Sequence, residues 1–176
     1  MPALPTELPP LIHLDLDMAA FATDWNHCDQ VANYLARLAS FDRADTFLYS
    51  NLLSTVLNEL FEIAFVHHQC AGQLGCTLRR AGKIDRIELR IPARVEDRAF
   101  LQRIVGEAQA DGVGERYRSA LLLDQAPDHS VGLLELAADY GARIEFQEIS
   151  APGEGVRLIV DVCLEEGPVL QPTLCV

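Results

Sequence analysis

The sequence contains few basic residues. Arginine and lysine together number 14, against 26 aspartates and glutamates, so the 176-residue chain has a formal net charge of −12 and an isoelectric point near 4.7. Proteins that bind nucleic acids or anionic lipids through charge rely on clusters of lysine and arginine. The charge balance therefore excludes nucleic acid and anionic membrane as expected partners, and it favours solubility.

Long apolar runs are also absent. No stretch is long enough to cross a bilayer, and the chain starts with prolines instead of a basic segment followed by an apolar one. We therefore expect neither a membrane span nor a signal peptide, and a cytoplasmic location. The five cysteines are scattered and lie among apolar residues, which predicts reduced core thiols.

Two glycine-based signatures are missing as well. There is no Gly-x-Ser-x-Gly motif, which excludes the common serine-hydrolase arrangement. The first expected strand is followed by Ala-Ala-Phe-Ala and not by the glycine-rich loop of dehydrogenases and methyltransferases.

The length of the chain favours a single domain. We expect a flexible lead-in at residues 1–10 and one domain at 11–176. Within that domain we expect an N-terminal strand and helix (11–41), a core (42–164) and a C-terminal tail (165–176).

Strand and helix patterns alternate along the chain. We expect strands at 11–18, 76–80 and 84–91, and helices at 25–39, 43–70, 97–110 and 117–124. A helix and a strand are expected within 129–146, and a closing hairpin with a final apolar strand within 151–162. The predicted helix caps are Thr23 or Asp24, Asp42 or Asp45, and Gly141. This order predicts a two-layer α/β sandwich, in which a mixed, mostly antiparallel sheet carries helices on one face.

The helix expected at 43–70 has two faces. Its apolar residues recur with the spacing of a buried helical side. Asn51, Thr55, Asn58 and Glu62 lie three or four residues apart and share a polar face. Such a polar stripe either meets solvent or lines a pocket.

The second half of this helix resembles the N-box helix of the GHKL ATPase superfamily, which has the Bergerat fold and includes histidine kinases and anti-sigma-factor kinases. The resemblance places Glu59 at the catalytic acidic position, Ala64 at the alanine and His67 at the basic position. Ile63 stands where the family has an asparagine that helps to hold magnesium. Because Mg²⁺ requires oxygen ligands and isoleucine has none, we expect the metal function to be lost.

Two further motifs complete the resemblance, which covers roughly residues 42–164. The family's Asp-x-Gly-x-Gly is replaced by residues 92–98, where Glu96 or Asp97 could substitute for the acid but no glycine follows. Gly132 with Leu133 matches the end of the Gly-x-Gly-Leu motif, while Ser130 takes the first glycine position. The resemblance thus implies a degenerate nucleotide site, made of Glu59, Asn58, Glu62, Ile63, His67, Asp97 and Gly132.

Within the superfamily the chain resembles small bacterial regulators related to SiaB-like threonine kinases. The resemblance rests on residues 58–62 (Asn-Glu-Leu-Phe-Glu), 132–134 (Gly-Leu-Leu) and 139–142 (Asp-Tyr-Gly-Ala). It implies a signalling regulator that acts by contact with a protein partner, such as a response regulator or an anti-sigma antagonist-like protein. The same prediction includes weak or no binding of ATP and magnesium, and no resident metal.

Two alternatives remain open. One is an ATP-dependent serine/threonine kinase in which Glu59 is the base and Asn58 or Glu62 takes over the metal. For this kinase, Ile63→Asn is expected to strengthen nucleotide binding without disturbing the fold. The other is a phosphotransfer or dimerisation module that uses the helix at 25–39. We expect Leu35 and Leu38 on the apolar side of this helix, and in this alternative they lie in a homodimer interface.

The histidines suggest two possible functional sites, a phosphoacceptor and a zinc site, and each is compared with a structural role. His27 lacks the acidic or arginine neighbours of a phosphoacceptor, which argues against phosphorylation. His67 and His68 with Cys70 and Cys76 are a candidate zinc set. Adjacent helical histidines point about 100° apart, however, so a role at the helix C-terminus is preferred.

Overall fold

The computed structural model describes residues 8–21, 23–66, 72–122, 130–149 and 155–164. Its elements are β1 (Ile12–Asp17), α1 (Met18–Phe21), α2 (Asn26–Ala39), α3 (Thr46–Val66), β2 (Gln73–Ala81), β3 (Ile84–Pro92), α4 (Val95–Gln109), α5 (Val113–Leu122), α6 (Ser130–Asp139), β4 (Arg143–Ile149) and β5 (Gly155–Cys163). The predicted C-terminal tail at 165–176 lies outside the described residues, as does most of the predicted lead-in.

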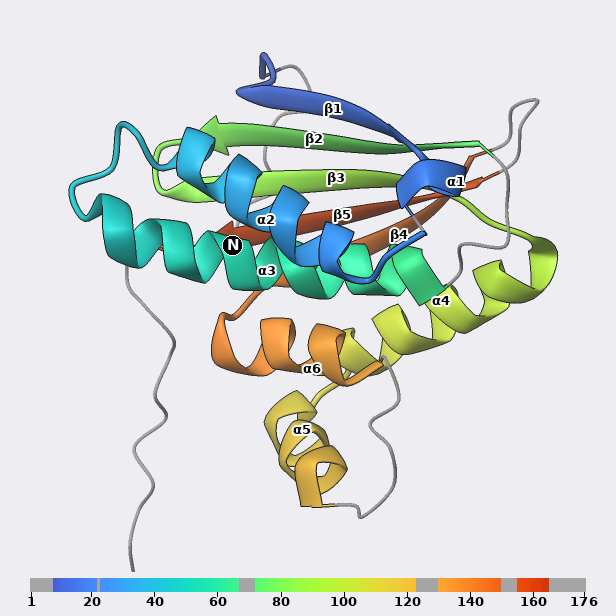
Figure 1. Ribbon diagram of the computed structural model, residues 1–176. Coiled ribbons are helices and arrows are strands. Elements are labelled where there is room, and N and C mark those ends of the chain that lie inside the picture. Colours follow the sequence, from blue (N-terminus) through green and yellow to red (C-terminus); the bar gives the residue numbers. More distant parts are fainter. Residues whose placement is uncertain (1–7, 22, 67–71, 123–129, 150–154, 165–176) are drawn as a thin grey trace, which may run out of the picture.

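The described elements form two layers, and the predicted α/β sandwich is confirmed. A five-stranded sheet has the order β1-β2-β3-β5-β4, and every described strand pair is antiparallel. Figure 1 shows α2 and α3 running across one face of this sheet, with α6 beside α3 and α5 farther from the sheet. None of the described helices has the length and apolarity that a membrane crossing requires.

The central hairpin follows from its turn. β2 and β3 pair from Gly75 with Arg90 to Ala81 with Ile84, which leaves a two-residue connection. Gly82 in this connection has a φ of 60°, a conformation that glycine adopts without the steric cost of a side chain. The hairpin and its glycine turn are as the sequence predicts.

Aspartates bind the first amides of α2 and α3, although the residue directly before α2 is Trp25, which makes no side-chain cap hydrogen bond. Oδ1 of Asp24 accepts a hydrogen bond from the Asn26 amide at 3.0 Å, and Oδ1 of Asp45 accepts one from the Leu48 amide at 2.9 Å. Each carboxylate satisfies an amide that lacks a partner in the first helical turn. The predicted end of the second helix, at residue 70, lies outside the described residues.

One expectation about α2 is wrong. Leu35 and Leu38 were both expected on its apolar side, but Leu35 is 3% exposed while Leu38 is 50% exposed. Small side chains of α2 pack inward with Leu35, and they are Cys28, Ala32, Ala36 and Ala39. Leu38 therefore lies on a different side of the helix, which faces solvent.

Two helix boundaries also differ from expectation. α4 begins at Val95, before Asp97, because the Asp97 carboxylate accepts the Arg94 amide at 3.1 Å and caps the helix. α5 begins at Val113 instead of residue 117. Gly112, with a φ of 77°, completes the turn early, and its carbonyl accepts the Glu115 amide at 3.1 Å.

The end of α6 matches the sequence prediction. Gly141 has a φ of 59°, and the Ala142 amide donates to the Leu136 carbonyl at 3.0 Å. This is the six-to-one hydrogen bond of a Schellman C-cap, and it directs the chain from α6 into β4.

A buried ion-pair network joins the corner between α2 and α3 to the β2–β3 hairpin. The Asp85 side chain is 0% exposed and accepts hydrogen bonds from Arg80 Nε at 2.8 Å and the Tyr49 hydroxyl at 2.6 Å. Arg43 lies 3.4 Å from both Asp85 carboxylate oxygens. Arg80 also donates to the Ala39 carbonyl at 2.8 Å. The network fixes the helical corner on the sheet.

The described cysteines are free thiols, as predicted. Cys28 and Cys76 are buried and Cys163 is partly buried. Burial raises the pKa of both buried thiols to about 12, so they remain protonated at neutral pH.

Candidate functional site

The predicted site residues fall on three helices. Asn58, Glu59, Glu62 and Ile63 lie on α3, Gly132 lies in the first turn of α6, and Asp97 lies in the first turn of α4. His67 lies outside the described residues, as do His68 and Cys70 of the candidate zinc set.

Glu59 and Gly132 are in direct contact. A Cβ atom at Gly132 would overlap Oε2 of Glu59 and lie 3.1 Å from Glu59 Cδ and 3.3 Å from Glu59 Cβ. The missing side chain at Gly132 is therefore what allows the Glu59 carboxyl group to lie against α6. The structure thus brings together the acid of the N-box-like helix and the glycine of the C-terminal motif.

The electrostatics of Glu59 favour its protonated form. Burial, together with the nearby carboxylates of Glu62 and Glu135, raises its pKa to about 7. A carboxyl group with a pKa near 7 can accept or release a proton at neutral pH, which is the requirement for a general base.

Two neighbours of Glu59 were missed by the sequence reasoning. Glu135 lies one turn after Gly132 on α6, and its pKa is raised by burial and by Asp139. The Tyr117 hydroxyl on α5 donates a hydrogen bond to Glu135. Burial, together with the carboxylates of Glu135, Asp139 and Glu59, raises the pKa of Tyr117 to about 12. The i to i+3 spacing from Gly132 was the signal that could have found Glu135. Tyr117 had no such signal.

Asn58 and Glu62 bind each other along α3. Asn58 Nδ2 donates to Glu62 Oε1 at 2.7 Å, which is an i to i+4 contact. The Oδ1 atom of Asn58 is buried and has no hydrogen-bond partner among the described residues. This hydrogen bond holds the Glu62 carboxylate, which interacts electrostatically with Glu59.

Ile63 is a core residue. It is 1% exposed and belongs to the main hydrophobic cluster. Its side chain offers no oxygen to Mg²⁺, and the described residues contain no group of three or more His, Cys, Asp or Glu side chains arranged to hold a metal ion. Ile63 therefore could contribute no ligand to a magnesium ion.

Asp97 has a local structural role. Its carboxylate is part of the capping box at the start of α4. The contacts described above bring together Glu59, Glu62 and Gly132, with Asn58 bound to Glu62.

His27 lies on α2 and is partly buried. Its Nδ1 atom donates to the Phe21 carbonyl at 3.0 Å. That hydrogen bond gives the ring a plain structural role next to α1.

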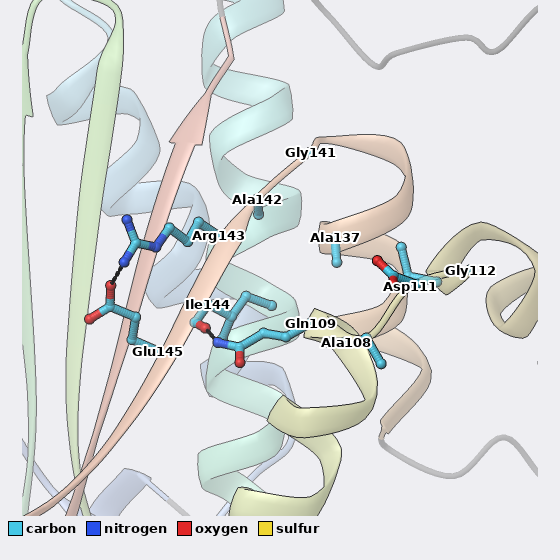
Figure 2. Close-up of a pocket in the computed structure, with 12 residues that line it drawn as sticks. Ala108, Gln109, Asp111, Gly112, Ala137, Gly141, Ala142, Arg143, Ile144 and Glu145 are labelled. Carbon is cyan, nitrogen blue, oxygen red and sulfur yellow. Dashed lines mark hydrogen bonds and ion pairs between the residues drawn. The ribbon is translucent and has the colours of Figure 1, made fainter. Parts of the chain in front are cut away.

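A separate hollow of about 620 Å³ lies at the other end of α6 (Figure 2). Small residues make up half of its lining residues, and they are Ala108, Ala110, Gly112, Ala137, Gly141 and Ala142. Among its polar side chains, Arg143 pairs with Glu145 at 2.5 Å, and Gln109 donates to the Ile144 carbonyl. None of the predicted site residues lines this hollow.

The pH dependence of stability should report the state of Glu59. Its folded pKa of about 7 exceeds the ordinary value of 4.5, so its stabilising contribution is full below pH 4.5 and is lost as the pH rises through 7. We expect the free energy of unfolding to fall between pH 5 and 8 by about 1–2 kcal/mol more in the wild type than in Glu59→Gln, allowing for solvent screening. Urea denaturation at several pH values measures this difference.

The matched control is Glu115→Gln, since Glu115 is an exposed glutamate on α5. It should retain the wild-type pH dependence. Equal pH dependence in the wild type and Glu59→Gln would show that the Glu59 carboxyl group is not desolvated.

Comparisons with known proteins identify a fold relative. No protein-family model and no curated protein sequence matches the chain. Among solved structures, it is similar to a chain in the crystal structure of the SiaB–SiaC complex from Pseudomonas aeruginosa, with 12% sequence identity and a TM-score of 0.63. The match covers 89% of this chain and 92% of that chain. At this identity the likeness concerns architecture, and it extends over nearly the whole length of both chains.

Proposed function

We propose that this protein is a bacterial signalling regulator that acts through contact with a protein partner and binds ATP and magnesium weakly or not at all. Its scaffold would be a degenerate relative of the GHKL ATPases. The observation that carries the proposal is the position of Ile63, which is buried in the core one helical turn from Glu59. In the resembled ATPases this position holds a magnesium-binding asparagine.

The contact between Glu59 and Gly132 supports the same proposal. The space that Gly132 leaves beside α6 is occupied by the Glu59 carboxyl group. The carboxyl groups of Glu62 and Glu135 interact electrostatically with that of Glu59. Negative charge on these groups would repel the phosphates of a nucleotide unless a cation lay between the carboxylates and the phosphates. At position 63, isoleucine provides no oxygen atom that could help to hold such a cation.

The architectural likeness supports a protein partner. The similar chain belongs to a structure described as a SiaB–SiaC complex, so a related architecture occurs in a complex of two proteins. A response regulator or an anti-sigma antagonist-like protein would be the class of partner. The acidic net charge of −12 favours a partner surface with basic residues.

Calorimetry with Mg-ATP and Mg-ADP tests this proposal. We expect no binding tighter than about 1 mM, and no rise in melting temperature with either nucleotide, because only a ligand that binds the native state raises it. A parallel titration with EDTA shows whether any heat depends on magnesium. Micromolar, magnesium-dependent binding would overturn the proposal.

A serine/threonine kinase is the second candidate, and the pKa of Glu59 favours it. A partly buried carboxyl group with a pKa of about 7 suits a general base that accepts a hydroxyl proton. In this alternative Asn58 or Glu62 would hold the metal, although each is now hydrogen-bonded to the other. Transfer of labelled phosphate from ATP to a co-encoded protein, lost in Glu59→Gln, would establish the kinase.

A further inference from the structure

Alternate side chains of the central strand β3 point away from the helices. Ile87 and Leu89 belong to the hydrophobic core, and successive residues of a strand point to opposite sides of the sheet. Arg86, Glu88 and Arg90 therefore lie on the side away from the core. In Figure 1, α2 and α3 lie across the core side of the sheet, so these two helices leave the second side uncovered.

The strand register brings further arginines to the same side. Arg79 of β2 is the cross-strand partner of Arg86, and Arg157 of β5 is the partner of Arg90. Asp161 of β5 is also a partner of Arg86, and it accepts two hydrogen bonds of 2.7 Å from that arginine. Partner residues of antiparallel strands project on the same side of the sheet. We call this set the arginine face, and its members are Arg79, Arg86, Glu88, Arg90, Arg157 and Asp161.

The charge of the arginine face is opposite to that of the chain. The whole sequence has 14 basic and 26 acidic residues, whereas the arginine face has four arginines and two carboxylates. On the same side of the sheet, β1 adds Asp15 and Asp17 at one edge, and β4 adds Arg143 paired with Glu145. The positive excess therefore lies on β2, β3 and β5. Because like charges directly opposite each other repel, this excess lowers the stability of the sheet.

Three arginines of the face share one carboxylate, that of Glu88. Arg79 Nη1 lies 3.2 Å from Glu88 Oε2, whereas Arg90 Nε and Arg157 Nε lie 3.3 Å and 3.0 Å from Glu88 Oε1. Glu88 itself is only 7% exposed. Because one carboxylate balances one guanidinium group, two positive charges remain beside Glu88.

The outer ends of Arg90 and Arg157 are unengaged. Their side chains are 51% and 33% exposed, and in the described part of the chain their Nη atoms have no hydrogen-bond partner. Arg79, in contrast, also donates from Nε to the Leu8 carbonyl at 3.0 Å. A guanidinium group has five N–H donors, so Arg90 and Arg157 present donors that converge beside one carboxylate oxygen. Such paired donors bind an oxyanion through two parallel hydrogen bonds.

We infer that the arginine face binds an acidic segment of a protein partner, whose carboxylates accept hydrogen bonds from Arg90 and Arg157. Both arginines stand on inner strands of the sheet, since β3 lies between β2 and β5, and β5 lies between β3 and β4. Because this backbone is already held on both sides, binding costs little conformational entropy. The acidic remainder of the chain repels such a segment, which directs it to the arginine face.

The inference rests on the proposed function for the existence of a protein partner. It adds which face of this chain meets that partner and which chemistry the face recognises. The net charge of −12 favours a partner with basic residues, and such a partner can carry them elsewhere on its surface. Only the segment that meets the arginine face has to be acidic.

Fluorescence anisotropy with a labelled hexaglutamate peptide tests the inference on the full chain. At about 20 mM salt, where screening between charges is weak, the wild type should bind the peptide with a Kd below about 200 µM. The double variant Arg90→Gln with Arg157→Gln should bind at least about tenfold more weakly, because it loses the charged donors. Arg79 remains bonded to Glu88 in this variant, so the melting temperature should stay within a few degrees of the wild type.

The matched control is Arg103→Gln, which removes the same charge from α4 at a side chain that is 50% exposed. It should bind the peptide as the wild type does, and a hexaglutamine peptide should not bind. No binding by the wild type, undiminished binding by the double variant, or equal weakening in Arg103→Gln would each overturn the inference. Displacement of the peptide by an equal molar amount of inorganic phosphate would overturn it too, because the arginines would then form a site for a free anion.

The same double variant separates this inference from the proposed function. Micromolar binding of Mg-ATP that persists in Arg90→Gln with Arg157→Gln would overturn the proposed function and leave the arginine face as inferred. Absence of both peptide and nucleotide binding in the wild type would overturn the inference alone.

Discussion

Replacing Asp85 by alanine should lower the free energy of unfolding by about 3–5 kcal/mol. The Asp85 side chain is 0% exposed and accepts hydrogen bonds from Arg80 and Tyr49, with Arg43 also within 3.4 Å. Alanine would leave two guanidinium groups next to a site that no longer holds a negative charge. Each guanidinium group would either remain desolvated without the carboxylate or move into water and separate the turn between α2 and α3 from the sheet. Urea denaturation with linear extrapolation measures the loss.

Asp42→Ala is the matched control, because it removes another carboxylate bound to the same arginine. The Asp42 side chain is 68% exposed and lies 2.6 Å from Arg80, so water can replace it at a cost of less than about 1 kcal/mol. Similar losses for the two variants would show that the Asp85 carboxylate is not buried.

The substitution Ile63→Asn should lower the free energy of unfolding by about 3–4 kcal/mol. Ile63 is 1% exposed within the hydrophobic cluster, so an asparagine there would lose apolar contacts and bury an amide. This result differs from the sequence expectation for a kinase, in which asparagine at this position strengthens nucleotide binding without disturbing the fold. The two expectations differ because position 63 is buried. An asparagine amide there would reach neither solvent nor a ligand.

Ile63→Val is the control, with an expected loss of about 0.5–1.5 kcal/mol. Calorimetry with Mg-ATP should be carried out on the same Ile63→Asn sample. A variant that keeps the wild-type stability and gains magnesium-dependent binding would show that position 63 faces a nucleotide cleft, and it would favour the kinase.

Local features of the fold were predictable because each depends on few neighbouring residues. Asp45 caps α3 through an amide three residues away, and Gly82 and Gly141 occupy positive-φ positions where the pattern of apolar residues stops. The start of α5 was not predictable in this way. Gly112 ends one helix and begins the next, and the apolar pattern did not distinguish a turn from a first helical turn.

The candidate site was predicted only in part. The spacing of Asn51, Thr55, Asn58 and Glu62 on one helix predicted a shared polar face, and Glu59 and Gly132 were both expected at the site from a resemblance of motifs. Their direct contact, and the place of Glu135 and Tyr117 beside them, follow from how α3, α5 and α6 pack. Helix packing brings together residues that no sequence interval relates.

The amino-acid order specified the α/β class, the hairpin, the helix caps and the acidic charge, because hydrophobic period, turn residues and ionisable groups act over a few residues. The burial of Ile63 and Leu35, the exposure of Leu38 and the raised pKa of Glu59 came from packing of the two layers. Burial and electrostatic environment are sums over neighbours that are distant in the chain. Two leucines three residues apart on α2 could therefore look equivalent in the sequence and still lie in the core and in water.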